Sequence, residues 1–112
     1  MAFRRGYSAE LELVHLLRQQ GFYSVRVPIS GGRGFPCDVL ASRNRERRAY
    51  EVKSTKNLTI YLYESDLSGL KEFSENFDFE PYIAVRWKFA KKNPWTFKLI
   101  SDESTLKISR GS

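Results

Sequence analysis

The spacing of apolar residues along the chain predicts two helices. Leucine and valine side chains recur at helical spacing over 7–20, and Gly21 follows as a typical helix end. A second apolar stripe of leucine and phenylalanine predicts a helix over 65–77, with its glutamate and lysine side chains on the opposite face. Each helix therefore has one face to bury against another layer of structure.

The segments between and after these helices have the character of strands. Over 22–28, Tyr23, Val25 and Val27 alternate with polar residues, which is the period of a strand with one buried face. The other segments with strand character are 37–43, 47–53, 58–63, 81–89 and 95–101. The order α-β-β-β-β-α-β-β predicts the α/β class, a mixed sheet flanked by helices. The last ten residues carry no clear pattern.

Length and composition favour one folded domain. The 112 residues contain no Pro/Gly/Ser-rich linker, so we expect a single domain over 1–112. The 14% aromatic content excludes a disordered tail. The sequence shows no apolar run of about 18 residues, so we expect no transmembrane helix. The first residues lack the apolar segment of a signal peptide.

The chain has few cysteine and histidine residues that could bind a metal. One cysteine, Cys37, and one histidine, His15, argue against an internal disulfide, a zinc site and most histidine-based catalysis. The ligands of a metal would therefore be carboxylates, which favour hard ions such as Mg²⁺ or Mn²⁺.

The charge of the chain indicates what kind of partner it could bind. A net charge of +6 suits a polyanionic partner, nucleic acid first and an anionic membrane surface second. Residues 1–60 carry 11 basic and 5 acidic side chains, residues 61–85 carry 1 and 6, and residues 86–112 carry 7 and 2. A uniformly basic surface would not have this acidic middle segment, although a solvated surface that happens to be basic remains the simpler interpretation of net charge alone.

Glu10 is an acidic residue within an apolar stripe. At 100° per residue, it falls among Leu13, Val14 and Leu17 on the first helix. A carboxylate on the core side is costly unless it is paired or binds a metal. The alternative is that Glu10 lies at the end of the stripe and reaches solvent past Gly6 and Tyr7.

A second acidic group lies on the predicted hairpin 37–53. Glu51 and Lys53 share one face by strand periodicity. A two-residue turn at positions 44 and 45 would place Asp38 opposite Glu51, and a four-residue loop would place it opposite Lys53. A three-residue loop would instead place Asp38 opposite Val52.

Both of the first two registers bring two carboxylates and an ammonium together. Two carboxylates about 4 Å apart repel by about 4 kcal/mol at an effective dielectric of 20. Lys53 by itself could compensate as a structural ion pair. A divalent cation would compensate better and leave the lysine available for chemistry.

These residues, with their neighbours, resemble a known family. Pro36-x-Asp38, twelve further residues and Glu51-Val52-Lys53 follow the pattern of the PD-(D/E)xK nuclease superfamily, with its restriction-endonuclease-like core. The segments that resemble the archaeal Holliday junction resolvases and their viral relatives are Arg5-Gly6-x3-Glu10, Gly21-Phe22-Tyr23-x2-Arg26, Ser30-Gly31-Gly32, Asp38-Val39-Leu40-Ala41 and Glu51-Val52-Lys53-Ser54-Thr55. The resemblance extends from about residue 4 to residue 100. Cys37 separates a proline and an aspartate that the family usually keeps adjacent, and Ser65-Asp66 stands where the family often has a glutamine.

The resemblance implies a catalytic site. Glu10, Asp38 and Glu51 would hold one or two Mg²⁺ ions, for which Mn²⁺ would substitute, and the Val52 carbonyl would add a backbone ligand. Lys53 would orient the attacking water or stabilise charge on the phosphate. Ser30 would be a further catalytic residue, and Asp66 receives no role.

The resemblance also implies the substrate and partners. The enzyme would cut four-way DNA junctions with paired symmetric nicks that leave 5′-phosphate and 3′-hydroxyl ends, in recombination and repair. It would be a homodimer that works with recombination accessory proteins in the cytoplasm of an archaeal cell or of an archaeal virus's host. The side chains expected to contact DNA are Arg4, Arg5, Arg26, Arg33 and Lys56. The candidates for the dimer interface are Tyr82, Trp87, Phe89, Trp95 and Phe97.

Three other functions fit parts of the pattern. Another nuclease of the same superfamily, restriction-like or nicking, would share the acidic residues. A non-catalytic module that binds branched DNA would need the basic surface alone. A basic scaffold protein could use the acids and Lys53 as a structural ion-pair network.

Overall fold

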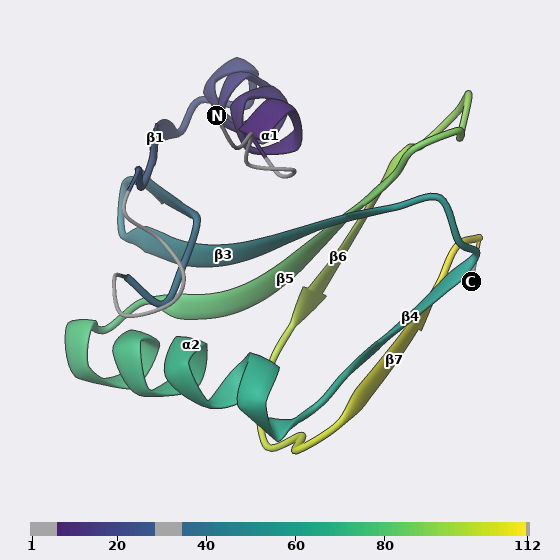
Figure 1. The fold of residues 1–112 in the computed structure, drawn as a ribbon. Coiled ribbons are helices and arrows are strands. Elements are labelled where there is room, and N and C mark those ends of the chain that lie inside the picture. Colours follow the sequence, from purple (N-terminus) through teal and green to yellow (C-terminus); the bar gives the residue numbers. More distant parts are fainter. Residues whose placement is uncertain (1–6, 29–34, 112) are drawn as a thin grey trace.

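A five-stranded mixed sheet separates the two helices of this chain, as Figure 1 shows for the computed structural model. The structure describes residues 7–28 and 35–111. Its elements are α1 (Tyr7–Gln19), β1 (Tyr23–Arg26), β2 (Val39–Arg43), β3 (Glu46–Thr55), β4 (Thr59–Leu62), α2 (Glu64–Phe77), β5 (Glu80–Trp87), β6 (Trp95–Leu99) and β7 (Leu106–Ser109). The predicted α/β class and the mixed sheet flanked by helices are confirmed.

The main sheet contains both antiparallel and parallel strand pairs. In the main sheet the order is β1-β2-β3-β5-β6, and the pairs β1–β2, β2–β3 and β5–β6 are antiparallel. Strands β3 and β5 are parallel, because the chain returns to the same end of the sheet through β4 and α2. The catalytic candidates of β3 therefore lie on a central strand, which holds its side chains rigidly.

Each face of the sheet packs against a different helix. On one face, α1 buries Leu13, Val14 and Leu17 in a cluster with alternate residues of β2 and β3, which include Tyr50 and Val52. On the other face, α2 buries its leucines in a second cluster with residues such as Ala49 and Ile83. Strand periodicity therefore directs Glu51 and Lys53 toward the α2 side of the sheet.

The β2–β3 hairpin has the register of the shortest predicted loop. Arg43 pairs with Glu46 and Val39 pairs with Tyr50, so the turn is the two residues Asn44 and Arg45. Asn44 adopts φ 56° in the left-handed region, which asparagine tolerates better than most residues. The structure thereby excludes the three-residue loop that would have placed Asp38 opposite Val52.

The end of the chain differs from the sequence-based expectation. Leu106–Ser109 forms a strand, β7, which pairs with β4 in a separate two-stranded sheet. The four-residue segment has too few alternations to stand out by pattern, and its strand is defined by pairing with a distant partner. No helix within residues 7–28 and 35–111 is long and apolar enough to span a lipid bilayer.

Replacing Leu67 by alanine tests the packing of α2. Leu67 is 0% exposed, whereas Leu58 is 65% exposed. Leu67→Ala should lower the free energy of unfolding by about 2–5 kcal/mol through lost apolar contact and a residual cavity. Leu58→Ala should change it by less than about 0.5 kcal/mol. Urea unfolding of both variants checks this, and equal effects would contradict the buried position of Leu67.

Candidate active site

Asp38 is held by the backbone of the neighbouring strand. It lies one residue before β2, and its own backbone N–H donates to the Tyr50 carbonyl at 2.8 Å. Its Oδ2 accepts the backbone N–H of Val52, also at 2.8 Å. Asp38 is only 8% exposed, so these bonds position a buried carboxylate at the start of β2.

Glu51 and Lys53 lie next to one another on the α2 side of β3. The Nζ of Lys53 is 3.4 Å from Oε2 of Glu51, and the two side chains are 35% and 24% exposed respectively. Because Val39 pairs with Tyr50, the register continues to Asp38 beside Glu51. The predicted grouping of the two carboxylates with this ammonium is therefore confirmed.

The surroundings of Glu51 disfavour its negatively charged form. Burial, and after it the charge of Asp38, raise the pKa of Glu51 to about 7 against the opposing effect of Lys53. Burial, with the charges of Asp38 and Glu51, raises the pKa of the adjacent Cys37 thiol to about 12. Cys37 is 0% exposed, so it is an inert core thiol rather than a nucleophile.

This electrostatic imbalance fits a bound cation. When both are ionised, Asp38 and Glu51 carry two negative charges, and Lys53 supplies one positive charge. A divalent ion would neutralise the remaining negative charge. The available donors are carboxylate and carbonyl oxygens, which match the preference of Mg²⁺ for hard ligands. Mg²⁺ is commonly bound through one or two carboxylates, with water and substrate phosphate completing its shell. The residues present therefore fit a magnesium ion on Asp38 and Glu51.

Glu10 reaches the sheet from the other side. It is 7% exposed, as its place in the apolar stripe predicts. Its Oε1 accepts from Nη1 of Arg26 on β1 at 3.2 Å, and the Arg26 guanidinium lies over the Tyr7 ring. Because α1 packs on the Tyr50 face, Glu10 approaches the opposite side of the sheet from Glu51.

The expected convergence of three acids on one cavity is thus not found in the described part of the chain. Within residues 7–28 and 35–111, no three Asp, Glu, His or Cys side chains are grouped closely enough to share a metal ion. The apolar stripe showed that Glu10 faces the sheet, but a helix can pack on either face, and the sequence pattern does not decide which. The role of Glu10 as a third ligand stays a prediction.

The residues expected to contact DNA divide into three groups. Arg26 is 18% exposed and is paired with Glu10, and its contact with DNA stays a prediction. Lys56 is exposed on the connection between β3 and β4. The remaining predicted site residues lie outside the described residues: Arg4, Arg5, Ser30 and Arg33.

Asp66 is a site neighbour to which the sequence analysis gave no role. Its negative charge contributes to the raised pKa of Glu51. Its Oδ2 also accepts the backbone N–H of Tyr63 at 2.7 Å, which holds the first turn of α2. The signal in the sequence was an acidic residue in the first helical turn, and the crossover from β3 to β5 brings that turn toward β3.

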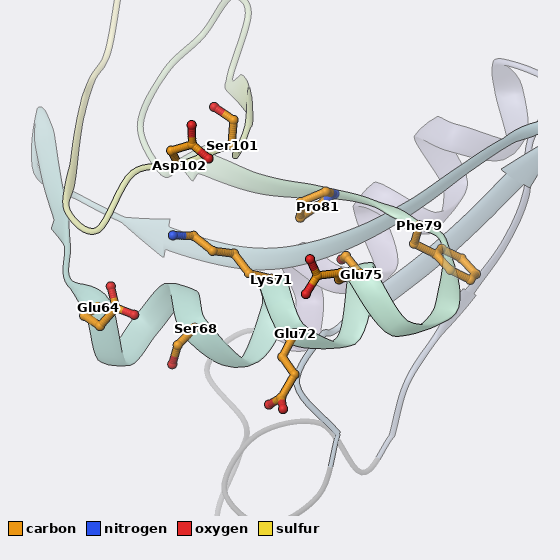
Figure 2. Close-up of a pocket in the computed structure, with 10 residues that line it drawn as sticks. Glu64, Ser68, Lys71, Glu72, Glu75, Phe79, Pro81, Ser101 and Asp102 are labelled. Carbon is orange, nitrogen blue, oxygen red and sulfur yellow. The ribbon is translucent and has the colours of Figure 1, made fainter.

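A cavity of about 690 Å³ lies away from these residues, between α2 and the connection that follows β6. Figure 2 shows Lys71 extending from α2 toward the segment that carries Ser101 and Asp102. The acidic side chains of its lining are Glu64, Glu72, Glu75 and Asp102. An excess of negative charge repels phosphate, so this cavity is a poor candidate for the DNA surface.

Comparison with known proteins decides the family. The family model "Archaeal holliday junction resolvase (hjc)" matches residues 1–110. The chain belongs to this family of resolvases. The resemblance seen in the sequence is therefore confirmed, and with it the assignment to the endodeoxyribonucleases.

Named relatives of the resolvase come from several archaea. The chain is 35% identical over 91 residues to the crossover junction endodeoxyribonuclease Hjc of Archaeoglobus fulgidus, covering 76% of this chain and 67% of that one. It is 34% identical over 85 residues to the Hjc of Methanocaldococcus jannaschii, covering 76% of this chain and 61% of that one. A rod-shaped virus of Sulfolobus islandicus encodes a crossover junction endodeoxyribonuclease that is 30% identical, with 70% and 69% covered.

A solved resolvase structure has the same fold. The Holliday junction resolvase Hjc of Archaeoglobus fulgidus matches with a TM-score of 0.75 and 31% identity, over 96% of this chain and 85% of that one. The restriction-endonuclease-like fold expected from the motif is therefore confirmed over nearly the whole resolvase chain.

The raised pKa of Glu51 predicts a pH dependence of stability in the metal-free protein. Because the pKa of Glu51 rises to about 7 in the folded state, its protonated form favours folding. That contribution is complete below about pH 4, the ordinary range of glutamate, and is lost as the pH rises through 7. The free energy of unfolding in EDTA should therefore fall by at most about 3 kcal/mol between pH 5 and pH 8.

The variant Glu51→Gln should remove most of this pH dependence, since it has no proton to lose. Glu75→Gln, at an exposed position on α2, should keep it. Denaturant unfolding across the pH range measures both variants. A slope in Glu51→Gln equal to that of the unmodified chain would contradict the raised pKa.

Proposed function

We propose that this chain is a Mg²⁺-dependent endonuclease that resolves four-way DNA junctions by paired symmetric nicks with 5′-phosphate ends, in recombination and repair. The observation that carries the proposal is the pair of neighbouring carboxylates, buried Asp38 and partly buried Glu51, with Lys53 beside Glu51 on a central strand. Family membership supports the junction as substrate, since the curated relatives are named crossover junction endodeoxyribonucleases.

The chemistry can be assigned to residues of this chain. Asp38 and Glu51 would hold the ion, and the carbonyl of Val52 would add a neutral oxygen. Bound there, Mg²⁺ supplies Lewis acidity toward the scissile phosphate and lowers the pKa of water. Mn²⁺, also a hard cation with oxygen ligands, would substitute.

Lys53 is placed to act on the reacting groups. Its ammonium is a compact point charge. The side chain is 35% exposed, so the ammonium can reach a phosphate while its ion pair with Glu51 holds it in place. It would orient the water or stabilise the negative charge on the phosphate oxygens in the transition state. The water oxygen bonds to phosphorus as the P–O3′ bond breaks, and a proton ends on the 3′ oxygen.

Glu10 has a distinct part in this proposal. To become a ligand it would have to exchange its ion pair with Arg26 for the metal. In the structure, Glu10 forms an ion pair with Arg26 at the edge of the sheet, beside the start of β2. Next to Arg26, the Val27 N–H donates to the Asp38 backbone carbonyl at 2.8 Å. We therefore assign Glu10 first to positioning the segment that carries Asp38.

Two symmetric cuts require two sites, which a twofold dimer would supply. Helix α1 covers the sheet over β1 to β3, but Phe97 and Leu99 of β6 are 40% and 45% exposed on the same face. Phe97 packs against Tyr50 within the chain, and Trp87 is a core residue at 1% exposure. We propose the β6 part of this face as the dimer surface.

Archaeal and viral relatives support the cytoplasm of an archaeal cell, or of a virus-infected one, as the compartment. Recombination accessory proteins would be further partners there.

Replacing Asp38 by asparagine tests the catalytic assignment. Asparagine keeps an oxygen that can accept the Val52 N–H, but it removes the negative charge that a divalent ion needs. Cleavage of a four-way junction in Mg²⁺ should fall by about 100-fold or more, while junction binding in EDTA should not weaken. Asp102→Asn, in the acidic cavity, is the matched control and should cut normally. Undiminished cleavage by Asp38→Asn would reject the assignment.

A comparison of substrates separates the resolvase from other nucleases of the superfamily. The unmodified protein should cut a four-way junction in Mg²⁺ much faster than a linear duplex of the same arm sequence, and EDTA should stop both reactions. Gel analysis of end-labelled strands would show paired nicks on opposite strands with 5′-phosphate ends. Equal rates on linear duplex would favour a restriction-like or nicking enzyme.

A further inference from the structure

Three distant segments form a basic surface at one end of the molecule. They are the connection between β3 and β4, the connection between β5 and β6, and the residue that follows β7, all at the same end in Figure 1. Backbone hydrogen bonds join them: Lys88 N–H donates to Thr55 at 2.8 Å, and Arg110 N–H donates to Leu58 at 2.9 Å. We call this surface the basic tip, with residues Lys56, Lys88, Phe89, Lys91, Lys92 and Arg110.

The five cations of the basic tip have no acidic side chain nearby in sequence. The stretches 52–63, 81–101 and 104–112 contain no aspartate or glutamate. All five are exposed, and within the described residues none takes part in a salt bridge. By contrast, the β2–β3 hairpin pairs Arg43 with Glu46 and Arg47 with Asp78. The basic tip is therefore an uncompensated positive patch.

Phe89 stands among these lysines with its ring in solvent. It is 72% exposed, more than any other phenylalanine in the described part of the chain, whereas Trp87 two residues earlier is 1% exposed. The turn that carries it is ordered by bonds from Trp87 N–H to Pro94 and from Ala90 N–H to Trp87. Asn93 adopts φ 48°, which tightens the return of the chain. An aromatic ring presented in this way is typical of a stacking contact with a base.

The basic tip continues the strand that carries the catalytic candidates. Lys56 follows Lys53 by three residues, a distance of about 10 Å along an extended chain. On β5, Val85 pairs with Lys53 and lies four residues before Phe89. DNA bound at Glu51 and Lys53 would thus reach the basic tip within about half a turn of the DNA double helix.

We propose that the basic tip holds a DNA arm beside the cut strand, with its lysines on phosphates and Phe89 stacked on a base exposed at the branch point. The proposal rests on the proposed function, since it adds a branch-reading surface to the same site. Phosphate contacts give affinity without sequence preference. An unstacked branch point can expose the flat face of a terminal base pair, whereas a continuous duplex keeps these faces stacked on one another.

Charge favours DNA over the other occupants. A second copy of a chain with net charge +6, placed tip to tip, would bring two uncompensated patches together. An anionic membrane would attract the lysines, but Phe89 and Leu58 are the only large apolar side chains exposed here within the described residues. Two such groups provide little apolar area for insertion.

The lysines are tested by the salt dependence of junction binding. Fluorescence anisotropy with a four-way junction in EDTA, at several salt concentrations, gives the slope of log affinity against log salt. The double variant Lys91→Ala/Lys92→Ala should reduce the magnitude of this slope by about 1.8, at about 0.9 per lost phosphate contact. Arg45→Ala, an exposed cation at the other hairpin, is the matched control and should keep the slope. An unchanged slope in the double variant would overturn the proposal.

The ring is tested by preference for branched DNA. Phe89→Ala should weaken binding to the four-way junction by about 10-fold, which corresponds to one lost stacking contact, and should leave linear duplex affinity nearly unchanged. Phe89→Trp should retain the preference. An equal loss on duplex and junction, or no loss on either, would reject the stacking role. Association with anionic vesicles that depends on Phe89, or a shift of Phe89→Ala to monomer in sedimentation, would assign the ring to another occupant.

These outcomes can be told apart from failure of the proposed function. If the unmodified protein cuts junctions while the tip variants bind like it, the junction endonuclease stands and the basic tip loses its role. If the unmodified protein neither binds nor cuts branched DNA, both proposals fall.

Discussion

The arrangement of this site depends on one hydrogen bond, from the backbone N–H of Val52 to the carboxylate of Asp38. It holds a buried charge against the central strand of the sheet, next to Glu51. The charged form of Glu51 is unfavourable there, because burial and then the negative charge of Asp38 raise its pKa to about 7. The fold therefore keeps a region of excess negative charge, and binding of a divalent ion would turn that excess into a stabilising contact.

Ordinary core packing holds the strand that carries Glu51 in place. Val52 and Tyr50 face the α1 layer, and Ala49 faces the α2 layer, so the strand between them is buried on both sides. A central strand in a mixed sheet moves little, which suits a site whose ligands must hold their geometry. Glu10 belongs to the α1 layer and pairs there with Arg26.

Charge is separated over the molecule in a way that suits one approach of DNA. The acidic segment 61–85 includes α2, and the cavity on that helix is lined with carboxylates. The uncompensated lysines gather at the other extreme, where β3 and β5 end. If the basic tip binds DNA as proposed, this charge separation would orient the polyanion before any specific contact forms.

Local patterns in the sequence were enough to predict both helices and six of the seven strands, and two of the three hairpin registers considered gave Asp38, Glu51 and Lys53 a shared face. These features follow from periodicity and from a turn whose length sets the register. The strand Leu106–Ser109, the side of the sheet that α1 covers and the gathering of Lys56, Phe89 and Arg110 were decided by tertiary structure. Each of these depends on contacts between segments far apart in the chain, for which a local pattern carries no information.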